Sequence, residues 1–156
     1  MTAAAKDTAG VVAPPPLLFA GFLAAGFLLD AIWPTVVFGY PWRFWVGGSL
    51  FVLGVLLMTA GVSRFNRAGT NVPTYRPTTA LVTGGPYRYS RNPLYISLFL
   101  AYAGIGIVAD NLWILALGVP LFLIMRYGVV AREERYLERK FGQAYLDYKA
   151  SVRRWL

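Results

Sequence analysis

The chain of 156 residues lacks cysteine and histidine, and it has only 7 Asp and Glu residues against 15 Lys and Arg residues. These absences exclude a disulfide framework, a zinc site of the Cys/His type, a Ser-His or Cys-His nucleophile and an imidazole base. Charged residues make up 14% of the chain and hydrophobic residues 57%, whereas soluble domains have about 25% charged residues. We therefore expect one domain over residues 1–156, no metal site, and chemistry that depends on carboxylates, Arg, Tyr, Asn, backbone groups or a bound cofactor.

Four apolar stretches have about the length that a helix needs to cross a bilayer core of about 30 Å. Their bounds are residues 17–33, 44–62, 94–109 and 112–130. They predict an all-α integral membrane bundle of four transmembrane helices. One alternative is a soluble helical bundle, but these stretches lack the polar stripe of a soluble helix. A second alternative applies to the first stretch, which would be a cleaved signal peptide with Lys6 in its basic region.

The third stretch is short, and the residues on either side of it define its ends. Asn92 and Pro93 are typical of an N-cap and a first helical position. Asp110 and Asn111 leave only a tight reversal before the fourth stretch. The last two helices are therefore predicted to form an antiparallel hairpin.

Basic residues gather in the loop 63–93 and after the fourth stretch, whereas the other two connections carry little charge. The basic residues of the two regions are Arg64, Arg67, Arg76, Arg88, Arg91, Arg132, Arg135, Arg139, Lys140, Lys149, Arg153 and Arg154. Because cytoplasmic segments carry an excess of Lys and Arg, we expect the loop and both termini in the cytoplasm. A nucleic-acid surface is the alternative use of the +8 charge. The positions next to the bilayer favour anionic lipid head groups instead.

Residues 131–150 change from apolar to amphipathic and predict a C-terminal interfacial helix. Glu133, Leu137, Phe141 and Tyr145 recur every four residues, and Tyr148 follows three residues later, which predicts one helical face. The adjacent Glu133 and Glu134 are either solvated surface acids or a functional pair.

Arg126 lies inside the fourth stretch, where a charge either snorkels to the interface or marks a functional site. Seven residues separate Arg126 from Glu133. We expect both side chains on nearly the same helix face, where they would frame one polar pocket at the cytoplasmic lip.

Four motifs follow one another between residue 70 and the C-terminus. They are residues 81–87 (Leu-Val-Thr-Gly-Gly-Pro-Tyr), 91–95 (Arg-Asn-Pro-Leu-Tyr), 133–134 (Glu-Glu) and 141–148 (Phe-Gly-Gln-Ala-Tyr-Leu-Asp-Tyr). In this order, and in these places relative to two apolar stretches, they resemble the isoprenylcysteine carboxyl methyltransferase family and the related phospholipid methyltransferases. Each motif alone occurs widely, so the resemblance depends on the ordered set.

The resemblance implies S-adenosylmethionine as cofactor and a lipophilic or amphipathic methyl acceptor in the lipid bilayer. It also implies a cytoplasmic cofactor pocket formed by the loop before the third helix, the start of that helix and the region after the fourth. By motif position, the cofactor-binding residues are Thr79, Ala80, Leu81, Val82, Tyr87, Asn92, Pro93, Leu94, Tyr95, Glu133 and Glu134.

Two positions depart from the prenylcysteine pattern. Asn92 stands where that pattern has histidine, although phospholipid methyltransferases also show Asn-Pro-x-Tyr. Val129 stands where the pattern has an arginine that holds the substrate carboxylate. Arg126 or Arg132 is the candidate to replace that arginine in orienting the acceptor. A carboxylate acceptor is favoured, an amine of phosphatidylethanolamine is the alternative, and a non-catalytic protein that keeps the fold is a third possibility.

The chemistry of methyl transfer fits a chain without histidine. Displacement at a sulfonium methyl needs positioning and partial desolvation more than a strong base, and a carboxylate acceptor is already ionised at neutral pH. An amine acceptor must lose a proton, which Tyr or a carboxylate would have to take. Glu133 and Glu134 would pair with cationic groups of the cofactor. The helix start at Asn92 offers free backbone N–H groups for its carboxylate. Tyr87 and Tyr95 would pack on the adenosine or belong to an interfacial aromatic belt.

Overall fold

The computed structural model describes residues 8–71 and 77–156, so the expectations for Lys6 and Arg76 lie outside the described residues. Within these ranges the chain is helical and contains no β-strand. The helices are α1 (Pro15–Ile32), α2 (Trp42–Arg67), α3 (Pro93–Val108), α4 (Leu112–Ile124), α5 (Ala131–Phe141) and α6 (Gln143–Ser151), with a 3₁₀ turn η1 (Gly85–Arg88) and a π-helical segment η2 (Met125–Val130).

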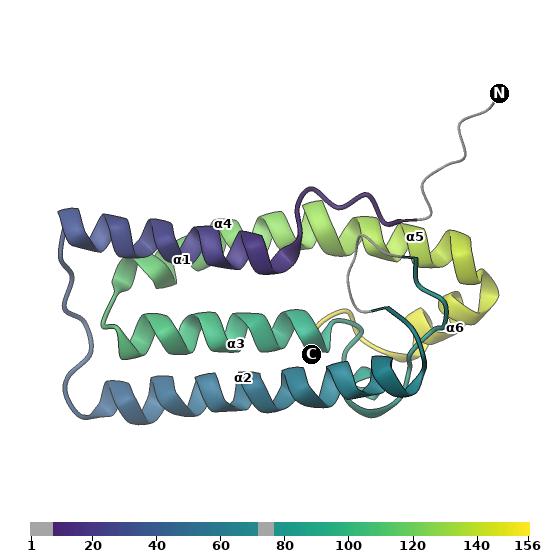
Figure 1. Ribbon diagram of the computed structural model, residues 1–156, viewed down its shortest axis with the longest axis horizontal. Helices are drawn as coiled ribbons and strands as arrows, with labels where there is room; N and C mark the ends of the chain where they lie inside the picture. Colours follow the sequence, from purple (N-terminus) through teal and green to yellow (C-terminus); the bar gives the residue numbers. More distant parts are fainter. Residues whose placement is uncertain (1–7, 72–76) are drawn as a thin grey trace.

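In the described parts of the chain, three helices are long and apolar enough to cross a membrane, which supports a multi-pass membrane protein. They are α1, α2 and the continuous helix Leu112–Phe141, which comprises α4, η2 and α5. The fourth apolar helix, α3, has only 16 residues. The long helices lie side by side along one axis, with α3 between α2 and α4 (Figure 1).

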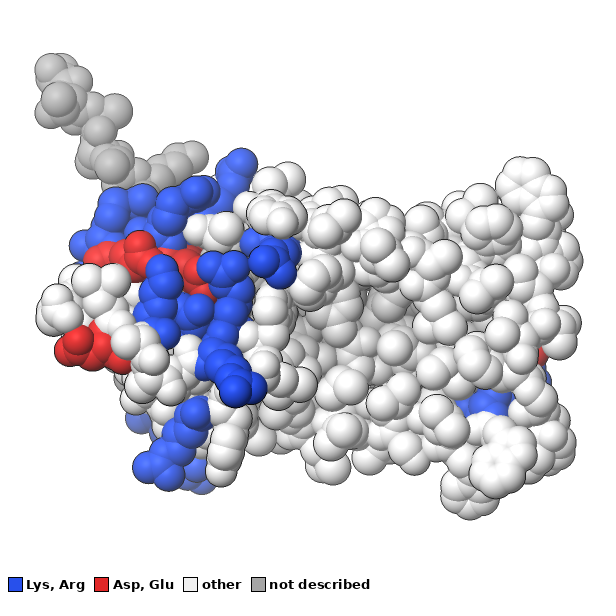
Figure 2. Space-filling model, turned by 180° about the vertical axis from the view of Figure 1, so that it is seen from behind, with Lys and Arg blue, Asp and Glu red and all other residues white. Residues whose placement is uncertain are grey.

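Charged side chains lie at the two ends of this bundle, and most of them lie at one end. Figure 2 shows Lys, Arg, Asp and Glu crowded together there, while the middle of the visible face carries none. The opposite end includes an ion pair between Arg43 and Asp110, whose Nη1 and Oδ2 atoms are 3.3 Å apart. The charged end, which includes α5 and α6, is called the pocket end below.

Glycine allows α2 and α3 to approach closely. Gly47, Gly54 and Gly61 recur every seven residues on α2 and are all buried. A Cβ atom on Gly54 would lie 2.7 Å from the carbonyl oxygen of Ser97 on α3. Small residues permit such backbone contacts between membrane helices, so this contact fixes α3, whose first turn belongs to the candidate site.

The predicted helix bounds need three corrections. The second helix continues to Arg67, so residues 63–67 of the predicted loop 63–93 are helical. The fourth helix does not end at residue 130 but continues through η2 into α5. Residues 131–150 do not form one interfacial helix, because Gly142, with a φ of +54°, separates α5 from α6. A positive φ suits glycine, which has no Cβ atom, and the chain reverses direction there.

The hairpin predicted between the third and fourth apolar stretches is confirmed. Asn111 caps α4, since its Oδ1 accepts a hydrogen bond from the backbone N–H of Ile114 at 2.9 Å. Asn92, the N-cap predicted for α3, stands before Pro93 but its side chain makes no capping hydrogen bond. The amide of Asn92 instead contacts residues far along the chain, as described below.

Candidate functional site

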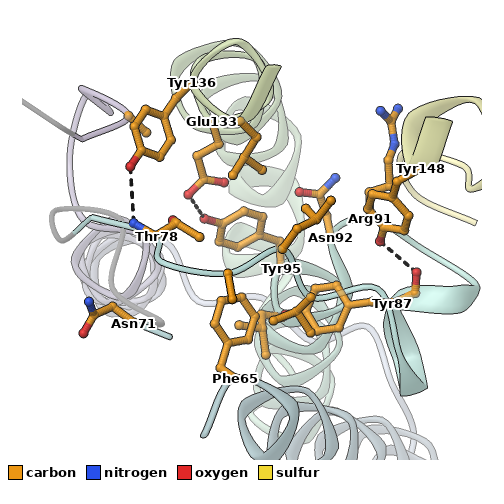
Figure 3. Close-up of a pocket in the computed structure, with 16 residues that line it drawn as sticks. Phe65, Asn71, Thr78, Tyr87, Arg91, Asn92, Tyr95, Glu133, Tyr136 and Tyr148 are labelled. Atoms are coloured by element: carbon orange, nitrogen blue, oxygen red, sulfur yellow. Dashed lines mark hydrogen bonds between the residues drawn. The ribbon is translucent and has the colours of Figure 1, made fainter. Parts of the chain in front are cut away.

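A partly open pocket lies at the pocket end of the bundle. Its walls come from the end of α2, the loop before α3, the first turn of α3, and α5 and α6 (Figure 3). It is lined by Ala9, Phe65, Asn71, Thr78, Ala80, Leu81, Val82, Tyr87, Arg91, Asn92, Leu94, Tyr95, Glu133, Tyr136, Leu137 and Tyr148.

Glu133 is the acidic residue in this lining. It lies in the first turn of α5, beyond the apolar part of the long helix, and it is half-buried. Its Oε1 accepts a hydrogen bond from the hydroxyl of Tyr95 at 2.7 Å (Figure 3), and Oε2 accepts none from the described residues. Burial raises the pKa of Glu133 to about 7, the hydrogen bond from Tyr95 lowers it, and the charge of Glu134 raises it. Among the described residues, the carboxylate therefore has no cationic partner.

Aromatic rings form much of the opposite wall. Tyr87 is buried on η1, and its ring meets that of Phe65 edge to face with centroids 5.5 Å apart. The hydroxyl of Tyr148 donates to the carbonyl oxygen of Tyr87 at 2.8 Å, which ties α6 to η1. Aromatic faces offer a binding surface to a flat heterocycle and to a cation.

The loop before α3 is held over the pocket by hydrogen bonds to its backbone. The hydroxyl oxygen of Thr70 accepts from the backbone N–H of Thr79 at 2.8 Å and of Ala80 at 3.3 Å. The backbone N–H of Thr78 donates to the Tyr136 hydroxyl at 3.2 Å. These bonds fix the stretch that precedes Leu81 and bring polar backbone to the pocket.

Eight of the eleven residues predicted to bind the cofactor line the pocket together. They are Ala80, Leu81, Val82, Tyr87, Asn92, Leu94, Tyr95 and Glu133. Three others do not line it. Thr79 is exposed and donates to the carbonyl oxygen of Gly69, Pro93 is buried at the start of α3, and Glu134 faces Arg91 and Arg154.

The two arginines predicted to orient the acceptor also lie outside the pocket lining. Arg132 Nη1 donates to the carbonyl oxygen of Gly10 at 2.8 Å, so it holds the segment before α1. Arg126 has a buried Nε without a hydrogen-bond partner among the described residues. The expectation that Arg126 and Glu133 frame one pocket is not met. Residues 125–130 are π-helical, and the wider turn changes the faces to which residues on either side project.

Eight lining residues were not in the set of predicted cofactor-binding residues: Ala9, Phe65, Asn71, Thr78, Arg91, Tyr136, Leu137 and Tyr148. A signal existed for two of them, since Leu137 and Tyr148 follow Glu133 with helical spacing. Ala9, Phe65 and Asn71 come from distant segments, and only the packing of the helices brings them to the site.

Comparison with known proteins agrees with this arrangement. Residues 42–144 match the phospholipid methyltransferase family, and this range contains most of the pocket lining. No solved structure matches the chain significantly.

Three curated relatives match more than 60% of the chain. The nickel-cobalt-cadmium resistance protein NccN of Alcaligenes xylosoxydans xylosoxydans is 33% identical over 100 residues, which are 64% of this chain and 46% of that protein. The cobalt-zinc-cadmium resistance protein CzcN of Cupriavidus metallidurans is 33% identical over 102 residues, with 64% and 45% covered. A protein-S-isoprenylcysteine O-methyltransferase of Dictyostelium discoideum is 30% identical over 114 residues, with 69% and 46% covered. The chain thus spans just under half the length of these relatives.

Proposed function

The chain belongs to the phospholipid methyltransferase family, and we propose that it transfers the methyl group of S-adenosylmethionine to a lipophilic acceptor in the membrane. The observation that carries this proposal is the position of Glu133, a half-buried carboxylate that lies in an aromatic-lined pocket and has no cationic partner among residues 8–71 and 77–156. A cationic ligand would supply that partner.

The residues of the pocket fit this cofactor. When bound, S-adenosylmethionine supplies a methyl group on a positively charged sulfur. Oε2 of Glu133, which accepts no hydrogen bond from the described residues, would accept from or pair with a cationic group. Tyr87 and Phe65 offer ring surfaces for an adenine. The pocket walls exclude water from one side of a bound ligand, which favours displacement at a charged sulfur.

We propose four membrane-crossing helices, with α3 as the fourth. At 1.5 Å per residue, the 16 residues of α3 extend about 24 Å, which is short for a span but is continued by the loop at the pocket end. The basic residues at that end support a cytoplasmic position for it and for both termini. The pocket then opens where a water-soluble cofactor and a membrane-bound acceptor both have access.

For the acceptor we favour a carboxylate of the isoprenylcysteine type, with a phospholipid amine as the alternative. The pocket lining contains no histidine, because the chain has none, and a carboxylate needs no base to become nucleophilic. Arg126, whose buried Nε has no hydrogen-bond partner in the described parts of the chain, is the candidate to orient an acidic acceptor at the membrane boundary. An amine acceptor would instead deliver its proton to a Tyr or to Glu133.

A transfer assay tests the proposal. Membranes from cells that express the protein are incubated with cofactor labelled on its methyl group, and the labelled lipids and proteins are identified by mass spectrometry. We expect labelling above the background of the host, lost in Glu133→Gln and kept in Glu138→Gln, because Glu138 pairs with Lys149 outside the pocket. Methyl ester products would favour the carboxylate acceptor, and methylated phosphatidylethanolamine the amine. Equal labelling with and without the protein would contradict the proposal.

A further inference from the structure

The segment that follows α6, residues 152–156, is bound tightly to the wall of the pocket. It leaves α6 in an extended conformation at Val152 and runs beside the first turn of α3 (Figure 1). The backbone N–H of Arg91 donates to the carbonyl oxygen of Arg153 at 2.9 Å. The carbonyl oxygen of Arg154 accepts from the Asn92 amide at 2.8 Å and from the Ser90 hydroxyl at 3.3 Å. Three consecutive residues before α3 thus hold this segment.

The side chain of Arg154 connects the same segment to α5. Its Nε donates to Glu134 Oε1 at 3.0 Å and its Nη2 to Glu134 Oε2 at 2.6 Å. Arg91 Nη2 also lies 3.3 Å from Glu134 Oε1. Such two-bond pairs between guanidinium and carboxylate are strong and fix orientation. Both oxygens of Glu134, whose side chain is only 7% exposed, are therefore occupied.

A further contact reaches α4. The ring of Trp155 lies 5.3 Å from that of Phe122, centroid to centroid. Residues 152–156 therefore contact the loop before α3, α5 and α4, which are the elements that surround the first turn of α3. A segment with contacts on three elements restrains their relative positions.

These contacts involve the site itself. Arg91 and Asn92 line the pocket, and Figure 3 shows the guanidinium of Arg91 directed away from Tyr95 and Glu133. The side-chain amide of Asn92, one of the residues expected to bind the cofactor, donates to the carbonyl oxygen of Arg154. Glu134 is adjacent to Glu133, and its charge acts on Glu133. Arg154 thus balances the charge of Glu134, whereas Glu133 has Tyr95 as a hydrogen-bond donor but no cation among the described residues.

We propose that residues 152–156 act as a strap that fixes one wall of the pocket, and that Arg154 is a positioning residue within it. By binding Glu134, Arg154 holds Arg91 and Asn92 in place and leaves Glu133 as the carboxylate that faces a cationic ligand. This proposal rests on the proposed function, because it assumes that the ligand of the pocket is S-adenosylmethionine. The titratable groups that face Glu133 are Tyr95 of α3, Tyr87 of η1, and Glu134 and Tyr136 of its own helix.

Arg153 provides a matched control for Arg154. The two residues are neighbours of equal charge, but the side chain of Arg153 is exposed, and its backbone carbonyl oxygen makes the hydrogen bond to the wall. We would titrate S-adenosylmethionine into detergent-purified full-length protein by calorimetry between pH 6 and pH 9. The variants are Arg154→Gln, Arg154→Lys and Arg153→Gln.

We expect Arg154→Gln to weaken binding about tenfold and to move the pH midpoint of binding upward, because Glu134 then acts on Glu133 with less compensation. Arg154→Lys keeps the charge and should recover part of both effects. Arg153→Gln should match the wild type. Equal affinity and equal midpoint in Arg154→Gln and Arg153→Gln would overturn the proposal. If Arg154→Gln does not fold, the affinity and the pH midpoint of Arg154→Lys are compared with those of Arg153→Gln instead.

Hydrogen exchange of the ligand-free protein separates this proposal from the function on which it rests. Loss of the strap should speed exchange of the Arg91 backbone amide about tenfold in Arg154→Gln and leave it unchanged in Arg153→Gln. A wild type that does not bind the cofactor would contradict the proposed function, while slow exchange at Arg91 would still show the strap. Binding by the wild type with unchanged exchange in Arg154→Gln would contradict the strap alone.

Discussion

Two carboxylates at opposite ends of the bundle are held in contrasting ways. Asp110, between α3 and α4, accepts backbone N–H bonds from Val37 at 2.8 Å and Phe38 at 2.7 Å, and it pairs with Arg43. The two N–H bonds, with Arg43 in addition, hold the pKa of Asp110 below its ordinary value. Glu133 receives one hydrogen bond from Tyr95, and burial raises its pKa to about 7.

The difference separates a structural charge from one that is available to a ligand. The protein fully compensates Asp110, so its ionised form stabilises the connection that closes the far end of the bundle. It compensates Glu133 only in part, so the ionised form costs stability until a cation binds. Groups with strongly perturbed pKa values in a pocket are candidates for function on this physical ground.

The largest expected effect comes from removing the charge of Glu133. We expect Glu133→Gln to weaken binding of S-adenosylmethionine about 100-fold at pH 8, because a half-buried cation would lose its counter-charge. The pKa of Glu133 is raised in the folded protein, so its stabilising contribution is lost as pH rises toward 7. The ligand-free variant should therefore melt at or above the wild-type temperature at pH 8. A lower melting temperature together with wild-type affinity would assign Glu133 a structural role.

A smaller effect is expected when Glu133 keeps its charge but loses its hydrogen bond. Tyr95→Phe removes the donor to Oε1 and should weaken cofactor binding about fivefold at pH 8, since the net contribution of a hydrogen bond to a charged group is modest. Tyr102→Phe is the matched control, because the hydroxyl of Tyr102 donates to Ile114 within the hairpin. Equal losses in the two variants, measured by calorimetry, would mean that packing and not the bond to Glu133 is responsible.

The smallest effect on cofactor affinity is expected from a change at the end of the bundle opposite the pocket. Asp110→Asn preserves the positive φ of 56°, which asparagine tolerates, but it removes the charge that pairs with Arg43. We expect a lower melting temperature at neutral pH and less than about a twofold change in cofactor affinity. Because the pKa of Asp110 is lowered in the folded state, the stability difference should shrink as pH falls through that pKa. A large loss of cofactor affinity would contradict the separation of the two ends.

Much of the fold follows from the apolar stretches and the prolines near their ends. Pro15 and Pro93 begin α1 and α3, and Asp110 with Asn111 marks the hairpin. The continuous helix from α4 into α5 was not predicted. The composition changes from apolar to amphipathic at residue 131, and this change was taken as a helix end. A change of composition does not interrupt the backbone hydrogen bonds of a helix. The glycines of α2 at seven-residue spacing were visible, but their role depends on which helix lies opposite.

The candidate site was predictable where motif residues lie close together in the chain. The pocket is lined by four such residues, Leu81, Val82, Tyr87 and Tyr95, together with Glu133. The pair Glu133-Glu134 was treated as one unit, yet adjacent residues on a helix point about 100° apart, and only Glu133 faces the pocket. Strap residues such as Arg154 depend on tertiary contacts that sequence spacing does not contain.

The pH dependence of cofactor affinity tests most directly that Glu133 is the carboxylate available to a cation. S-adenosylmethionine is titrated into wild type and Glu133→Gln from pH 5 to pH 9 in the same detergent. With a pKa of about 7 for Glu133, wild-type affinity should be constant at high pH and fall about tenfold per unit well below pH 7, while the variant binds weakly at every pH. The same affinity profile in both proteins would contradict the account.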